Sequence, residues 1–183
     1  MKKILVLHAS PRKNGNTAEM VRVFCDGARE KGHHVTLFSL GDTSIHPCKA
    51  CDYCQTHQGK CSQNDDMAKL YPLLQSHDTL VIAAPVYYLG FPGILKNAID
   101  RTYAESAIGR KIRYSILLTA ACKQDPSVTK VMTDYYQALM SYLGIKDLGI
   151  ISAFGVDAPG ELISTESGNT SLFEDILRLG QSL

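Results

Sequence analysis

The sequence predicts an α/β protein with a doubly wound, five-stranded parallel sheet between two layers of helices. Apolar periodicity switches repeatedly between that of a strand and that of a helix along the 183 residues. Such alternation is typical of a parallel sheet with helices on both faces. Because no repeat, low-complexity tract or linker interrupts it, residues 1–183 are expected to form one domain.

The first strand–helix unit has the clearest pattern. Residues 3–9 (KILVLHA) are almost continuously apolar, as expected of a central parallel strand that is buried on both faces. Residues 17–31 follow as an amphipathic helix, with Asn16 as its expected N-cap and Gly32 at its end.

The later units repeat this arrangement after a cysteine-rich loop at about 41–65. Periodicity predicts four further strands, at 35–40, 79–84, 112–119 and 148–154. It predicts four further helices, which begin near 65 and near 94 or span about 127–143 and 171–181.

Composition excludes several classes of partner. The net charge of +1 gives no electrostatic reason to expect nucleic acid or an anionic membrane. No apolar run approaches the ~18 residues that a membrane span requires. The N-terminus runs directly into a strand without the pattern of a signal peptide, so a cytoplasmic protein is expected.

Ligands of open α/β sheets bind beyond the carboxyl ends of the strands, at the switch point in strand order. The loop after the first strand, residues 9–17 (ASPRKNGNT), has the composition of an anion site. Hydroxyls, amides, Arg12 and the N-terminus of the following helix can together surround a phosphate. Helix capping and turn formation are the alternative explanation of the same residues. The residues expected to bind are Ser10, Arg12, Asn14, Asn16, Thr17 and Ala18.

Two further loops are suited to a flat ring. Residues 85–93 (PVYYLGFPG) combine prolines, glycines and aromatics where the chain leaves the sheet, and Tyr87 or Tyr88 can stack on a ring face. Phe91 is instead expected to pack against the next helix or a dimer partner. Small residues after the fourth strand let backbone approach a ring closely. The ring-binding candidates are Pro85, Val86, Tyr87, Tyr88, Leu89, Gly90, Thr119, Ala120 and Ala121.

These loops resemble those of the NADPH-dependent FMN reductase family, whose members have a flavodoxin-like fold. The similarity rests on SPRxxGNT at 10–17, PVYY at 85–88 and LKNAIDR at 95–101. It implies a sheet in the order 2-1-3-4-5, with FMN phosphate at the first loop and isoalloxazine at the second. Homo-oligomers, dimers or tetramers, are implied as well.

The cysteine-rich loop is similar, more narrowly, to that of the iron-sulfur flavoprotein branch of the family. Four cysteines fall within fourteen residues, at Cys48, Cys51, Cys54 and Cys61. The resemblance implies that they hold a [4Fe-4S] cluster, which needs four sulfur ligands. Structural zinc, free thiols and a disulfide are the alternatives. Asp100 and Arg101 are expected to pair, or to bond to backbone, at the end of a helix.

The resulting hypothesis is an FMN-dependent oxidoreductase. It would take electrons from NAD(P)H or a ferredoxin-like donor and pass them to a quinone, another small acceptor or the cluster. Because the flavin supplies the chemistry, no catalytic side chain is assigned. A non-enzymatic electron carrier and a zinc-binding structural or sensor protein on the same fold are the alternatives. Motifs do not encode the donor, the acceptor or the reduction potential.

Overall fold

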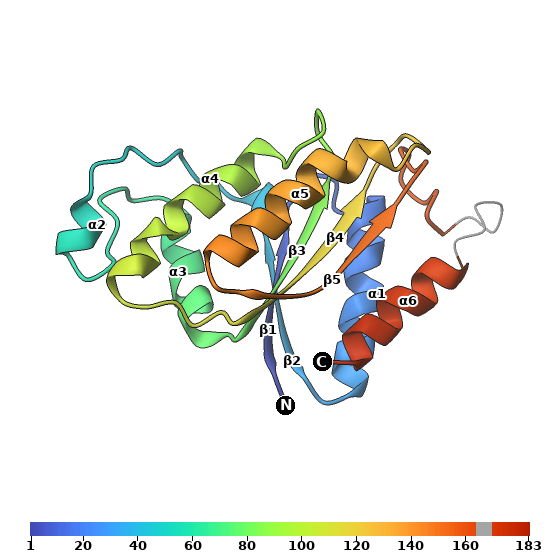
Figure 1. The fold of residues 1–183 in the computed structure, drawn as a ribbon, viewed down its shortest axis with the longest axis horizontal. Helices are drawn as coiled ribbons and strands as arrows, with labels where there is room; N and C mark the ends of the chain where they lie inside the picture. Colours follow the sequence, from blue (N-terminus) through green and yellow to red (C-terminus); the bar gives the residue numbers. More distant parts are fainter. Residues whose placement is uncertain (164–169) are drawn as a thin grey trace.

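The strands form one five-stranded parallel sheet in the order β2-β1-β3-β4-β5 (Figure 1). A computed structural model describes residues 1–163 and 170–183. The predicted strand number, direction and order are therefore confirmed. The strands are β1 (Lys3–His8), β2 (His34–Ser39), β3 (Thr79–Pro85), β4 (Tyr114–Ala120) and β5 (Lys146–Ala153).

Helices cover both faces of the sheet and make a three-layer sandwich (Figure 1). One face carries α1 (Asn16–Glu30) and α6 (Thr170–Gln181), and the other carries α3 (Met67–Ser76), α4 (Gly93–Arg101) and α5 (Ser127–Tyr142). Short helical turns complete the described chain: α2 (Tyr53–Thr56), η1 (Leu40–Asp42) and η2 (Thr102–Ala107).

Strand β1 lies at the centre of two separate cores. Leu5 and Leu7 pack in the core under α3, α4 and α5, whereas Ile4 and Val6 pack in the core under α1 and α6. All four side chains are buried. This explains why the strand lacks polar alternation, because side chains on both of its faces leave water.

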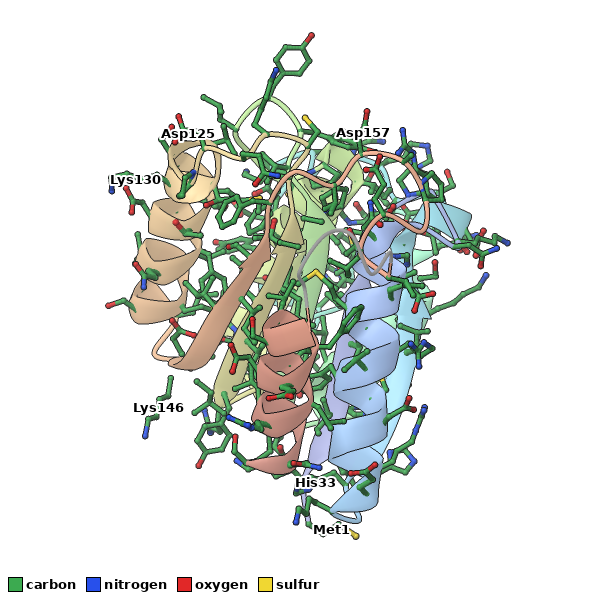
Figure 2. The ribbon with its side chains drawn as sticks, turned by 90° about the vertical axis from the view of Figure 1, so that its right-hand side faces the viewer. Met1, His33, Asp125, Lys130, Lys146 and Asp157 are labelled. Carbon is green, nitrogen blue, oxygen red and sulfur yellow. The ribbon has the colours of Figure 1, made fainter. Side chains whose placement is uncertain are left out.

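Helices α1 and α6 lie side by side over one face of the sheet (Figure 2). Their contact depends on two glycines. A Cβ atom added at Gly27 would lie 2.3 Å from the carbonyl oxygen of Leu177, and one added at Gly180 would lie 2.5 Å from that of Phe24. Only glycine permits so close an approach of the two backbones.

The first helix begins one residue earlier than expected, and this changes the role of Asn16. Asn16 is the first helical residue and Gly15 occupies the N-cap position, so the expected cap by Asn16 is wrong. The Asn16 side chain instead donates a hydrogen bond to the carbonyl of Ala158 at 3.0 Å and accepts one from the backbone N–H of Leu162 at 3.1 Å. A long-range contact has replaced the local one.

None of the helices in the described part of the chain is long and apolar enough to cross a membrane.

Candidate functional site

The loops after β1, β3, β4 and β5 surround a polar pocket of about 110 Å³ at the carboxyl edge of the sheet. Figure 2 places Asp157 at this end of the molecule, near the start of α1 and opposite Met1. The predicted residues that line the pocket are Ser10, Arg12, Asn16, Thr17, Pro85, Val86, Tyr87 and Ala120.

Other predicted residues lie outside the pocket lining, although they belong to the same loops or to the adjoining ends of α1 and β4. These are Asn14, Ala18, Tyr88, Leu89, Gly90, Thr119 and Ala121. Conversely, Gly15, Cys122, Val156 and Asp157 line the pocket without having been proposed as site residues. Cys122 directly follows the small residues after β4, which could have indicated it, but no local pattern marks Val156 or Asp157.

The first loop and the start of α1 form the end of the pocket at which an anion site was expected. Ser10 and Thr17 are 5% and 3% exposed, so both side chains are buried at this end of the pocket. The Ser10 hydroxyl accepts a hydrogen bond from the Arg12 backbone N–H at 3.1 Å, which closes a tight turn ahead of α1. The 15-residue α1 then directs its N-terminal amides and the positive end of its dipole at the pocket.

The loop after β5 is fastened across this end of the pocket. Arg12 donates to the backbone carbonyl of Asp157 at 2.6 Å, and its guanidinium lies 3.6 Å from the Asp157 carboxylate. Asn16 holds the same loop through Ala158 and Leu162. Arg12 and Asn16, both expected to bind the phosphate, thus also hold the loop after β5 in place beside the pocket.

The loop after β3 forms a tight turn at the rim. The backbones of Tyr87 and Gly90 exchange two hydrogen bonds of 3.0 Å, and Tyr88 and Leu89 between them have φ angles of 47° and 65°. Left-handed conformations are costly for non-glycine residues and concentrate at functional sites. The turn leaves the Tyr88 side chain fully exposed, while Tyr87 lines the pocket. Phe91 packs against a helix, although its ring contact is to Tyr135 of α5, edge to face with centroids 5.7 Å apart, and α4 is the helix that follows it directly.

The four clustered cysteines line a second, smaller pocket of about 30 Å³. Figure 1 shows this loop with α2 at the far end of α4 from the turn after β3. Its sulfurs share the pocket with Tyr71, Arg101 and Tyr103. All four cysteines are free thiols, so a disulfide among them is absent from this structure. Within residues 1–163 and 170–183, no three cysteine, histidine or acidic side chains come close enough together to hold a single metal ion.

Arg101 and Asp65 form a buried ion pair beside the cysteine pocket. Their side chains are 1% and 3% exposed. Burial opposes ionisation of Asp65, but hydrogen bonds from Arg101 and from the backbone of His46 and Met67 outweigh it and lower the carboxyl pKa to about 2. Of the two expectations for this helix end, Arg101 bonds to backbone, at the carbonyl of His46, whereas Asp100 binds Lys96 in place of Arg101.

A doubly wound parallel sheet in the order 2-1-3-4-5, with a pocket at its carboxyl edge, defines the flavodoxin-like class of folds. Residues 2–149 match the family described as NADPH-dependent FMN reductase. The chain therefore belongs to this family, and the assignment made from its motifs is confirmed.

Curated relatives include two iron-sulfur flavoproteins from Archaeoglobus fulgidus. One is 38% identical over 55% of this chain and 48% of its own length, and the other is 30% identical over 88% and 72%. The chain spans about half the length of the first of these relatives, and about half the length of two further iron-sulfur flavoproteins, from Methanocaldococcus jannaschii and Methanosarcina thermophila. An FMN-dependent NADH:quinone oxidoreductase from Clostridium beijerinckii is 26% identical over 88% of this chain and 90% of its own.

Solved structures show the same fold at low identity. An NAD(P)H:quinone oxidoreductase from Methanothermobacter marburgensis superposes with a TM-score of 0.75 at 18% identity, covering 99% of this chain and 95% of that one. An FMN-dependent NADH-azoreductase from Bacillus anthracis, in complex with FMN, gives 0.69 at 17% identity and covers 98% of both chains.

Proposed function

We propose that this protein is an FMN-dependent oxidoreductase, formed as one domain by residues 1–183, that takes electrons from NAD(P)H or a ferredoxin-like donor and passes them to a quinone or another small acceptor. The observation that carries the proposal is the pocket in which the start of α1 faces the loop after β3. One side of this pocket suits a phosphate and the other suits an aromatic ring. Membership in a family of FMN reductases supports the same cofactor.

The residues present fit FMN in their chemistry. The helix N-terminus with the Ser10 and Thr17 hydroxyls would hold the phosphate, because these residues are buried and line the same pocket. The Val86 backbone N–H donates to the carbonyl of Ala120 at 2.9 Å, which ties the ring-side loop to the end of β4. When bound, FMN supplies hydride acceptance and electron release, and the protein supplies orientation and the local field.

The pocket also supports a proposed homo-oligomer. Its volume of about 110 Å³ is well below the ~300–1,000 Å³ typical of a site that buries a ligand. Part of the flavin would therefore lie on the open rim and need cover from a second subunit. Apolar and aromatic side chains exposed on the adjacent surfaces offer such an interface: Tyr87, Tyr88, Leu89, Val131 and Tyr135.

We further propose that Cys48, Cys51, Cys54 and Cys61 hold a [4Fe-4S] cluster. Four thiols line one pocket, which is the donor set that such a cluster requires. Each thiolate binds a different iron, so the sulfurs surround a group of atoms and need not meet at one point. This suits four sulfurs that share a pocket better than it suits a single zinc ion, which needs its ligands within about 2.3 Å.

The first test is the absorption spectrum of anaerobically purified protein, with assays for iron, acid-labile sulfide and released flavin. We expect one FMN per chain, about four irons per chain and a broad absorbance near 400 nm that bleaches on reduction. Steady-state oxidation of NADPH and NADH with a quinone then separates an enzyme from an electron carrier, which would show little turnover. Zinc without flavin, even after addition of FMN, would refute the proposal.

A further inference from the structure

Arg101 reaches from the end of α4 into the wall of the cysteine pocket. Its Nη1 donates to the Asp65 carboxylate and, at 3.4 Å, to the backbone carbonyl of His46. Its Nη2 donates to the sulfur of Cys61 at 3.4 Å. The Nε atom is buried and has no hydrogen-bond partner in the described part of the chain. One planar guanidinium thus connects a fixed carboxylate with one of the four sulfurs.

Asp65 is the fixed part of this arrangement. Its carboxylate accepts hydrogen bonds from the backbone N–H groups of His46 at 3.0 Å and Met67 at 3.1 Å, and lies 3.2 Å from His46 Nδ1. Because backbone on either side of the four cysteines is bonded to this carboxylate, its position is fixed relative to them, and it holds the guanidinium in place. Of the guanidinium nitrogens, Nη2 is the one that donates to a sulfur of the pocket.

A buried cation beside a sulfur ligand has an electrostatic consequence as well as a structural one. A charge that has left water is weakly screened and interacts strongly with charge changes nearby. Reduction of a sulfur-bound iron cluster adds one negative charge to the cluster. Hydrogen bonds to the sulfurs and local charge are among the factors that set the reduction potential of such clusters.

We propose that Arg101 is the positioning residue of the cysteine pocket and that its charge raises the reduction potential of an iron-sulfur cluster held there. The inference rests on the cluster proposed above. Arg101 directs Cys61 into the pocket, and its guanidinium favours the reduced cluster, which gains one electron and no proton in this step. Asp65 opposes the effect, because its negative charge partly cancels that of Arg101.

The test is a redox titration of reconstituted protein that contains iron, sulfide and FMN, followed by visible and electron paramagnetic resonance spectroscopy. We expect Arg101→Gln to lower the ratio of reduced to oxidised cluster about tenfold at a fixed potential, which corresponds to about 59 mV for one electron. Asp65→Asn should shift the ratio in the opposite direction, and Arg101→Lys, which keeps the charge, should shift it less than Arg101→Gln does.

Lys96→Gln is the matched control. Lys96 is a cation of the same helix, but it is half exposed and paired with Asp100, so its loss should leave the cluster potential unchanged. Iron per chain and circular dichroism are measured for every variant. If Arg101→Gln does not fold, Asp65→Asn carries the test, because its cluster potential is expected to rise above that of the wild type.

Two results would overturn the inference in distinguishable ways. Wild-type protein that binds FMN but retains no iron would remove the proposed cluster and this inference with it. A wild-type cluster whose potential is unchanged in the Arg101 variants at equal iron content would refute the inference alone. Shifts of the same sign in Asp65→Asn and Arg101→Gln would also refute it, because loosening of the loop explains them.

Discussion

Gly41 lies against the backbone of the first loop, and its substitution by alanine should weaken the FMN binding proposed for that loop. Gly41 lies in η1, directly after β2. A Cβ atom at this position would lie 2.7 Å from the carbonyl oxygen of Ser10 and 2.9 Å from the Cα of Pro11. Both neighbours are backbone atoms of the first loop, which cannot move aside as the end of a side chain can.

The size of the effect follows from this geometry. Ordinary van der Waals contact begins at about 3.4 Å, so the loop must shift by several tenths of an ångström. Overpacking of this kind typically costs about 1–3 kcal/mol. If the shift of Ser10 weakens the free energy of FMN binding by the same ~1–3 kcal/mol, the dissociation constant of FMN should rise about 5- to 150-fold.

The assay is titration of apoprotein with FMN, followed by quenching of flavin fluorescence, alongside thermal unfolding. Gly27→Ala is the matched control, because its Cβ would also meet backbone, at 2.3 Å from the Leu177 carbonyl oxygen, but between α1 and α6. We expect Gly27→Ala to lower stability while the folded protein keeps its FMN affinity. Unchanged FMN affinity in Gly41→Ala would refute the proposed role of the first loop.

Three other predictions concern stability. The pKa of Asp65 is about 2 in the folded protein and ~3.9 in an unfolded chain. The ionised carboxylate therefore contributes fully to the free energy of unfolding above about pH 4, and this contribution is lost as the pH falls toward 2. Urea unfolding over this range should show the loss in the wild type and not in Asp65→Asn. Tyr136→Phe should lower the free energy of unfolding by about 1–3 kcal/mol, because it removes the buried hydrogen bond of 2.8 Å between the hydroxyls of Tyr136 and Ser115. An unchanged denaturation midpoint would contradict this. Leu89→Gly should raise stability by up to about 1 kcal/mol by calorimetry, because the left-handed φ of 65° strains leucine; a lower melting temperature would argue against strain.

The sequence alone determined the layered fold, because local hydrophobic patterns carry that information. Residues 3–9 could be identified as a central strand from their unbroken apolar run, and the structure gives Lys3–His8 with buried side chains on both faces. The loops that follow β1 and β3 could be placed at one edge because parallel strands end there. The family followed from motifs in those loops.

Only the tertiary structure decided how individual side chains are used. Asn16 has the local features of an N-cap, yet it binds Ala158 and Leu162, which lie 142 and 146 residues away. Arg101 bonds to Asp65 and Cys61 across 36 and 40 residues rather than to its neighbour. Periodicity reports which face of an element is buried, but it cannot show which polar groups meet there. Those pairings depend on where the chain returns in space, and the packing of the whole sheet sets that.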